Sequence, residues 1–420
     1  MPQNSAQRPQ PEPQSPSPTR NGERPYIYIA CPWTPVGGGM FKVADYLIQS
    51  QDPRGDRRGA QLRPLDTRGA GSAPASLLVL VGALLKIARG RMSGALAGVH
   101  VNMAERLSLA RKSALILTCK ALGVPVVLHL HAAQLHHTYR SFPAPAQRLV
   151  RWVFSLPERC VVLGQASADF VTQELKVARE RVEVVINGVP QPRLERRRPD
   201  GRFRLLFVGN LSERKGVSDL LQALSFPQLA HLPWTATFVG GGDVEGYRAK
   251  ARQLGLDKRV RFEGWADQAR VASLLSEADA LALPSHDEGL PLAILEALAH
   301  GVAVLCTPVG EIPHVLTDGH NACFVRPGDP ASIANGLSRV LGDPALRERL
   351  EHNGRALYQQ EFSLSRFFAN IAAIHQREFG VSGKLPASDA TLPPGAVRKS
   401  AGAKAEAPRS VSAVLPEARP

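Results

Sequence analysis

Residues 281–309 read LALPSHDEGLPLAILEALAHGVAVLCTPV, and the fold assignment starts from this stretch. The apolar run Leu281–Pro284 predicts the end of a buried strand, and the polar run Ser285–Asp287 predicts a turn. A helix is then expected to open at Glu288 and Gly289. The apolar run Val302–Cys306 predicts a second strand. Strands that alternate with helices in this way are typical of a parallel sheet.

Two carboxylates, Glu288 and Glu296, lie eight residues apart within this expected helix. That spacing corresponds to about 12 Å along a helix axis and a rotation of roughly 80°, so both side chains can face one cleft. Glu288 would lie at the helix mouth, where unpaired amides and the positive end of the dipole can hold a phosphate. This geometry suits a nucleotide sugar. An ordinary crossover helix with solvated acids is the plainer alternative.

A strand, a turn and a helix also begin the second half of the chain. Leu205–Val208 predicts the strand, and the turn that follows reads GNLSERKG over residues 209–216. A cationic loop in this place puts Lys215 near a phosphate bound between two domains, although a solvated lysine is the alternative. The next strand ends at another glycine turn that opens toward the crevice and includes Gly241.

The first half opens with a predicted strand, Tyr26–Cys31, and a helix from Met40 to Gln49. The turn between them reads PWTPVGGG and ends at Gly38 and Gly39. Glycines at such a turn let the backbone approach a ligand and point its amides at phosphate. The dinucleotide fingerprint is absent, because its third glycine is missing.

A histidine, His131, directly follows another predicted strand of the first half, Val124–Leu130. His131 would open onto the ligand crevice, as residues at the carboxyl ends of parallel strands do in doubly wound sheets. His129 is the alternative by one strand period, and a purely structural histidine is the plainer interpretation. Four residues that follow are expected to line an acceptor side: His136, His137, Tyr139 and Arg140.

The alternating elements predict an α/β fold of two doubly wound, Rossmann-like domains that face a central cleft. Composition and periodicity divide the chain into a tail (1–23), a first domain (24–196), a second domain (197–361), a last amphipathic helix (362–380) and a second tail (381–420). Both tails are poor in core-forming residues and are expected to be disordered.

The acidic pair in E-G-L-P-L-A-I-L-E, followed by A-L-A-H-G-V-A-V and Gly310-Glu311-Ile312-Pro313, resembles the signature of retaining GT-B glycosyltransferases of family 4. The resemblance extends over roughly residues 25–380. It implies the GT-B fold, in which the last helix crosses back to the first domain. It also implies transfer of a sugar, with retention at the anomeric carbon, from a UDP- or GDP-type donor.

The resemblance implies roles for the candidate residues. Glu288 would bind a hydroxyl of the donor sugar, and Glu296 the ribose. His131 would position the sugar or stabilise charge, while Lys215 would neutralise the leaving diphosphate. The remaining donor-site residues are Gly38, Gly39, Gly241, Arg214, Gly289 and Leu290.

The sequence departs from the family pattern at Asn210, where relatives commonly carry an arginine that contacts the diphosphate. Either Arg214 supplies the second positive charge, or one cation and backbone amides hold the phosphate. No D-x-D cluster or His/Asp triad suggests a metal, so a metal-independent reaction is expected.

Residues 99–113, VHVNMAERLSLARKS, resemble polysaccharide-assembling members of the family, which often use lipid-diphosphate acceptors. A lipid-linked oligosaccharide acceptor in bacterial surface polysaccharide assembly is therefore expected. A sugar-nucleotide hydrolase or epimerase with the same architecture is one alternative. A non-catalytic, membrane-associated assembly subunit is another.

Charge is distributed unevenly along the chain. Residues 24–196 carry a net charge of +12, whereas residues 197–380 carry −1. A basic half points to an anionic partner such as a membrane surface, and the absence of nucleic-acid-binding motifs argues against DNA or RNA. The expected anion-binding face comprises Lys86, Arg89, Arg91, Arg106, Arg111 and Lys112. A solvated basic surface is the alternative.

Five cysteines lie far apart, mostly in apolar runs, which is typical of core residues in a reducing compartment. The N-terminus has no apolar signal-peptide core, and the apolar run Ala75–Leu85 is too short to span a bilayer. A cytoplasmic protein is expected, with peripheral contact at the inner face of the plasma membrane.

Overall fold

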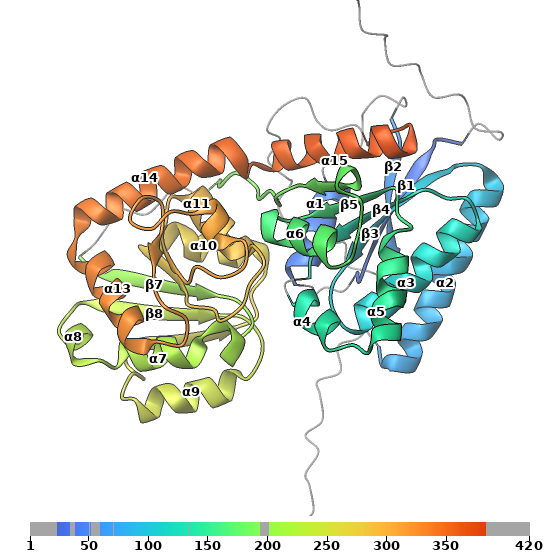
Figure 1. Cartoon of the computed structure of the whole chain (residues 1–420). Coiled ribbons are helices and arrows are strands. Elements are labelled where there is room, and N and C mark those ends of the chain that lie inside the picture. Colours follow the sequence, from blue (N-terminus) through green and yellow to red (C-terminus); the bar gives the residue numbers. More distant parts are fainter. Residues whose placement is uncertain are drawn as a thin grey trace, which may run out of the picture.

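The structure of the protein is a computed structural model, which describes residues 23–33, 38–49, 51, 59–69, 71–132, 134–193 and 201–383. These residues form two α/β domains that lie side by side (Figure 1). Each domain is built on one six-stranded sheet, and every described strand pair in both sheets is parallel.

The first sheet has the strand order β2-β1-β3-β4-β5-β6. Its strands are β1 (Tyr26–Cys31), β2 (Gln61–Asp66), β3 (Leu96–Met103), β4 (Val126–Leu130), β5 (Arg159–Val162) and β6 (Val182–Val184). The helices of this domain are α1 (Gly39–Gln49), α2 (Ala73–Ser93), α3 (Leu107–Ala121), α4 (Leu135–Arg140), α5 (Ala144–Phe154) and α6 (Gln165–Gln173). Alternate residues of β1 enter two cores, because both faces of the sheet are covered. Ile27 and Ile29 pack with α1, whereas Tyr26 and Ala30 pack with α2, α3 and α5.

The second sheet has the order β12-β11-β10-β7-β8-β9. Its strands are β7 (Phe203–Val208), β8 (Trp234–Val239), β9 (Val260–Gly264), β10 (Ala280–Leu283), β11 (Ala303–Cys306) and β12 (Cys323–Phe324). The helices are α7 (Val217–Leu224), α8 (Pro227–Ala230), α9 (Val244–Gln253), α10 (Gln268–Glu277), α11 (Leu292–His300), α12 (Ile312–Val315), α13 (Pro330–Gly342), α14 (Pro344–Glu361) and α15 (Leu364–Phe379).

The predicted α/β fold of two doubly wound sheets is confirmed. In each sheet the strand order reverses once, between β1 and β3 in the first and between β7 and β10 in the second. Ligands of doubly wound sheets bind beside such a reversal, at the carboxyl ends of the strands. The arginine-rich segment 51–72 contributes the edge strand β2.

The predicted tails fall largely outside the described residues, which omit 1–22 and 384–420. Residues 381–383, assigned to the second tail by composition, instead join the first domain, where the amide of Ala60 donates to the carbonyl of Ser382 at 2.8 Å. Within the described ranges, no helix is both long enough and apolar enough to cross a membrane.

The last helix, α15, crosses back over the first domain, as the family resemblance implies (Figure 1). At the break between α14 and α15, the amide of Val189 donates to the carbonyl of Phe362 at 3.0 Å. Near the other end, Arg159 pairs with Glu378 at 2.6 Å. One apolar core runs from α1 through α15 into the second domain, so the helix ties the two halves together.

A chain of buried histidines also joins α15 to the first sheet. His375 Nε2 lies 2.8 Å from His100 Nδ1 on β3, and His100 Nε2 lies 3.2 Å from His129 Nδ1 on β4. Burial lowers the pKa of His100 to about 3 and the pKa values of His129 and His375 well below their ordinary range. The folded protein therefore holds these rings neutral at pH 7.

We expect the free energy of unfolding to fall as the pH is lowered from 6.5, the ordinary histidine pKa, toward 3. In this window the unfolded chain takes up protons that the folded chain excludes, so acid favours unfolding. Each such histidine contributes at most about 1.4 kcal/mol per pH unit. His375→Phe should flatten this dependence in urea denaturation, and the exposed control His231→Phe should not. The same slope in wild type and His375→Phe would contradict the assignment.

Candidate functional site

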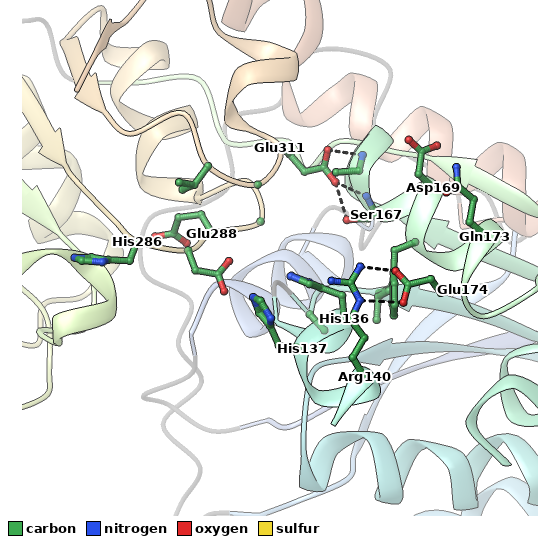
Figure 2. A pocket seen from close by; sticks show the side chains of 18 residues that line it. His136, His137, Arg140, Ser167, Asp169, Gln173, Glu174, His286, Glu288 and Glu311 are labelled. Carbon is green, nitrogen blue, oxygen red and sulfur yellow. Dashed lines mark hydrogen bonds and ion pairs between the residues drawn. The ribbon is translucent and has the colours of Figure 1, made fainter. Parts of the chain in front are cut away.

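The two domains enclose a cavity of about 540 Å³. Helices α4 and α6 line it from the first domain, and the loops after β10 and β11 line it from the second (Figure 2). Its titratable lining residues are His136, His137, Arg140, Asp169, Glu174, His286, Asp287, Glu288 and Glu311. The cavity thus has polar walls on both sides, as a site for a charged, hydroxylated ligand requires.

Lys215 and Glu288, predicted separately from the sequence, meet at the strand-order reversal of the second sheet. Lys215 follows β7 and Glu288 follows β10, and the ammonium group of Lys215 donates to Oε1 of Glu288. The hydroxyl of Ser285 donates to the same oxygen at 2.7 Å. Glu288 is only 6% exposed, so these contacts compensate for the burial of its charge.

A glycine allows this approach. Gly216 ends the short 3-10 turn Glu213–Lys215 with φ of +68°, a conformation that other residues rarely adopt. A Cβ at this position would lie 2.0 Å from the carbonyl oxygen of Pro284. The absence of a side chain therefore lets the lysine turn pack directly against the segment that carries Glu288.

The predicted helix start at Glu288 is wrong. Helix α11 begins at Leu292, and Pro291 is its N-cap residue. The residue before a proline is disfavoured in helical conformation, which prevents the helix from extending back through Leu290. Glu288 and Gly289 therefore lie in the preceding loop, and the spacing derived for two acids on one helix does not apply. Gly289 lines the cavity, whereas Leu290 is buried in the core.

Glu296 lies in α11, where it contacts the first domain. Its Oε1 accepts a hydrogen bond from Lys42 Nζ of α1 at 3.1 Å. Gly39, the first residue of α1, faces the same helix, because a Cβ built there would lie 3.4 Å from Leu292 Cδ1. The predicted glycine turn and Glu296 thus meet across the domain boundary. Gly38 is described, but residues 34–37 of this turn are not. Lys42 is not among the residues that the sequence pattern predicts at the site.

Arg214 lies close enough to contribute a second positive charge. Its Nη1 donates to the carbonyl of Asp287 at 2.7 Å and lies 3.8 Å from Glu288 Oε2. Asn210, which stands where relatives commonly carry an arginine, lies beside Gly241, whose carbonyl accepts from the amide of Leu211 at 2.7 Å. The structure therefore brings Arg214 and Lys215 to one carboxylate.

His131 is held in one orientation at the end of β4. Its Nε2 lies 2.8 Å from Asn102 Oδ1, and its ring lies 4.1 Å, centroid to centroid, from that of His129. Burial, reinforced by His100, lowers the pKa of His131 to about 3. Its neighbours Leu130 and Ala132 line the cavity, whereas His131 itself is half-buried and is not among the lining residues. The alternative, His129, is fully buried in the histidine chain.

The first-domain wall contains three of the four residues expected on an acceptor side, and all four lie in α4. His136, His137 and Arg140 of α4 line the cavity, and Tyr139 is buried behind them. Arg140 pairs with Glu174, the C-cap residue of α6, through two hydrogen bonds of 2.6 and 3.1 Å. Within the described residues, no group of three or more His, Cys, Asp or Glu side chains is arranged to hold a metal ion.

Glu311 of the second domain caps a helix of the first. Its Oε1 accepts from the amide and hydroxyl of Ser167 at 2.8 and 2.7 Å, and its Oε2 accepts from the amide of Ala166 at 3.1 Å (Figure 2). These are the amides that α6 cannot satisfy internally, and its own N-cap residue is Gly164. A Cβ at Gly164 would lie 2.3 Å from Glu311 Oε2. The carboxylate of the second domain thus caps the N-terminus of α6 in the first domain.

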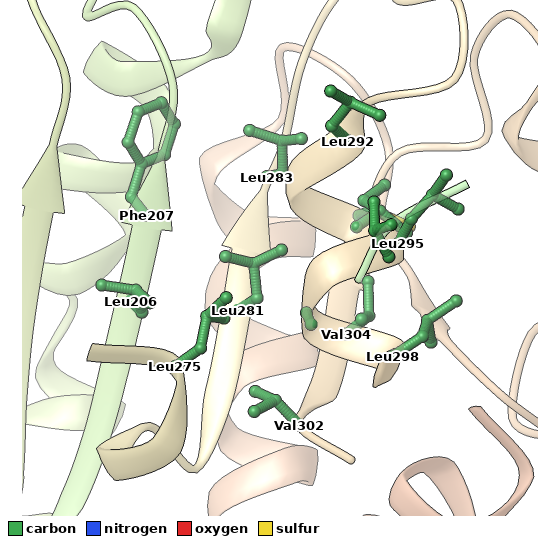
Figure 3. Packing of buried hydrophobic residues seen from close by; sticks show 14 of the residues in the cluster. Leu206, Phe207, Leu275, Leu281, Leu283, Leu292, Leu295, Leu298, Val302 and Val304 are labelled. Carbon is green, nitrogen blue, oxygen red and sulfur yellow. The ribbon is translucent and has the colours of Figure 1, made fainter. Parts of the chain in front are cut away.

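Packing beneath the cavity holds the second-domain loops in place. Leu281 and Leu283 of β10, Leu295 of α11 and Val304 of β11 are fully buried against one another (Figure 3). Close-packed side chains of this kind resist displacement, because any shift leaves a void. The loop with Glu288 therefore starts from a rigid strand and ends at a rigid helix.

We expect Glu311→Ala to expose the start of α6. Losing a cap worth about 1.4 kcal/mol should raise hydrogen exchange at the amides of Ala166 and Ser167 about tenfold. Glu311→Gln, which keeps an acceptor but not the charge, should have a smaller effect. The control Glu245→Ala removes an exposed acid of α9 and should change nothing there. Unchanged protection in Glu311→Ala would show that the cap is not needed.

Two protein-family models match this chain, one over most of each domain. The family model Glycosyltransferase Family 4 matches residues 52–191, and the model Glycosyl transferases group 1 matches residues 192–357. A glycogen synthase of Mycobacterium tuberculosis is 28% identical over 247 residues, which are 57% of this chain and 60% of that protein. An alpha-D-kanosaminyltransferase of Streptomyces kanamyceticus is 26% identical over 63% of this chain and 73% of that protein. The match to the glycogen synthase therefore covers less than two thirds of that protein.

Solved structures support the fold alone, since their sequence identity is low. Sucrose-phosphate synthase from Thermosynechococcus elongatus has a TM-score of 0.70 at 19% identity, over 85% of this chain and all of that one. Anabaena Alr3699/HepE in complex with UDP and glucose has a TM-score of 0.66 at 19% identity, over 84% and 99%. Together with the family models, these matches show that the chain carries a glycosyltransferase family 4 domain followed by a glycosyl transferases group 1 domain, in a GT-B fold.

Proposed function

We propose that the protein transfers a sugar from a nucleotide diphosphate sugar, with retention at the anomeric carbon, to a lipid-linked oligosaccharide in surface polysaccharide biosynthesis. The observation that carries this proposal is the contact between Lys215 and Glu288 at the strand-order reversal of the second sheet. A cation and a carboxylate in this place suit two parts of the donor, its anionic diphosphate and its hydroxylated sugar. The cation neutralises phosphate, and the carboxylate accepts hydrogen bonds from sugar hydroxyls.

The donor is a UDP- or GDP-sugar. Support comes from Alr3699/HepE, which shares this fold and whose solved structures hold UDP, UDP and glucose, or UDP-glucose. Lys215 and Arg214 neutralise the leaving diphosphate, aided by backbone amides near Gly38, Gly39 and Gly241. This supply of positive charge requires no metal ion. Glu288 orients the donor sugar, and Gly289 with Leu290 shapes the loop around it.

Two further residues act on the donor. Glu296 accepts hydrogen bonds from the ribose hydroxyls, in place of the hydrogen bond it now accepts from Lys42. His131, neutral and held by Asn102, positions the transferred sugar or stabilises charge near the anomeric carbon. We assign no general base.

The acceptor enters along the first domain. His136, His137 and Arg140 line that wall of the cavity, and the residues 24–196 around it carry a net charge of +12. A basic surface favours an acceptor whose lipid diphosphate is anionic and embedded in an anionic membrane. The protein then works at the inner, cytoplasmic face of the plasma membrane.

Glu288→Ala should lower kcat at least about a hundredfold, because the carboxylate contacts the reacting sugar. The assay is release of the nucleoside diphosphate from a panel of UDP-, GDP- and ADP-sugars, with and without a lipid-diphosphate acceptor extract. The exposed control Glu245→Ala should retain full activity. Full activity of Glu288→Ala would contradict the site. Turnover without acceptor would favour a hydrolase or epimerase, and absence of nucleotide binding by calorimetry would favour a non-catalytic subunit.

Glu296→Ala should raise the donor KM about tenfold and change kcat little. The variant cannot form the charged hydrogen bond to the ribose that Glu296 forms when the donor binds. Lys42→Ala removes the competing partner of the same carboxylate and should not raise the KM. If both variants raise the KM equally, Glu296 serves the domain contact rather than the ribose.

A further inference from the structure

Helix α2 carries an unusual number of exposed apolar side chains. The described part of the chain has ten large hydrophobic side chains that are exposed, and five of them lie on this helix. These five are Leu77 (61% exposed), Leu78 (75%), Val81 (45%), Leu85 (51%) and Met92 (79%). We refer to them as the α2 stripe. Scattered exposed leucines are ordinary, but five on one helix mark an interaction surface.

The α2 stripe faces away from the protein core. At about 100° per residue, its five members fall within an arc of roughly 100° on the helix. Leu80, Ala83 and Ile87, which are buried against the first sheet, fall on the opposite side of the helix. The helix therefore has two apolar faces, and its own domain covers only one of them.

Positive charge borders the α2 stripe. Lys86 and Arg89 are exposed and make no hydrogen bond or ion pair with any described residue. Helices α2, α3 and α5 together contain eight Lys or Arg residues and no Asp or Glu. Not every predicted cation takes part. Lys112 is buried and donates to Thr67 Oγ1 at 2.5 Å, so its place in the expected anion-binding face is wrong.

Helix α5, which contacts α3 as α2 does, carries further exposed apolar side chains. Helices α2, α3 and α5 cover the same face of the first sheet, because their buried residues share one core. On the outer side of α5, Leu149 and Trp152 are 56% and 51% exposed, next to the exposed Arg148. Only residues 141–143 separate α5 from α4, which lines the cavity.

We propose that the α2 stripe, with Leu149 and Trp152, docks into the headgroup region of an anionic membrane. Apolar side chains flanked by Lys and Arg on a helix are the features that bind such an interface, with the helix lying in its plane. A second copy of the chain fits less well, because a symmetric contact would bring the same acid-free, basic helices together. One part of this proposal rests on the proposed function, namely that the membrane presents the lipid-linked acceptor beside α4.

The test is sedimentation of the full chain with vesicles of phosphatidylglycerol and phosphatidylcholine, or of phosphatidylcholine alone. Wild type should bind the anionic vesicles at low salt and dissociate as salt rises. The variant Leu78→Glu with Met92→Glu should bind at least about tenfold more weakly, because inserting two carboxylates is unfavourable. The control Gln253→Glu with Gln359→Glu makes the same charge change on the second domain and should bind like wild type. Lys86→Gln with Arg89→Gln should reduce the preference for anionic vesicles.

Three results would overturn the proposal: no vesicle binding by wild type at low salt, equal binding by wild type and the α2 variant, or a wild-type dimer that the α2 variant dissociates in the absence of lipid. Light scattering measures the last. All variants should bind UDP or GDP like wild type in calorimetry, because the altered residues lie outside the cavity. If wild type binds no nucleotide, that result counts against the proposed function. It does not contradict the proposal that the α2 stripe binds membranes.

Discussion

The charged residues of the cleft are brought together by one constraint, which is that the strands of a parallel sheet all end at the same edge. The two sheets turn these edges toward each other, so loops from distant parts of the sequence converge. Lys215 and Glu288 are separated by 73 residues and meet because β7 and β10 are neighbouring strands. Lys42 and Glu296 are separated by 254 residues and meet because the two edges face one another.

Two acids of the second domain are held by groups of the first. Glu311 completes α6, and Glu296 accepts from Lys42. Both contacts compensate for the burial of a carboxylate, so they favour the present arrangement of the domains. In the proposed function, a donor ribose takes the place of Lys42 at Glu296. Donor binding and domain arrangement are then coupled, since the same carboxylate takes part in both.

Periodicity and turn composition are sufficient to predict the two doubly wound domains and several of their strands, because these features depend on local pattern. The family resemblance added the crossing of α15. The predicted start of α11 lies too early, because Pro291 disfavours helical conformation at the residue before it. Lys42 and the cap by Glu311 could not be predicted, since each depends on the approach of two domains. The run Ala75–Leu85 likewise gives no indication of which face of α2 the protein leaves uncovered.

The pairing of Gly164 with Glu311 has a consequence for how related sequences can vary. Any side chain at residue 164 would occupy the space of the Glu311 carboxylate, since even a Cβ would lie 2.3 Å from Oε2. A related sequence with a side chain at residue 164 must carry a shorter residue at 311, or must hold the acid at 311 in another position. It must then supply a new cap for α6 from within the first domain. The two positions should therefore change together, and such correlated replacement would mark relatives whose domains meet differently.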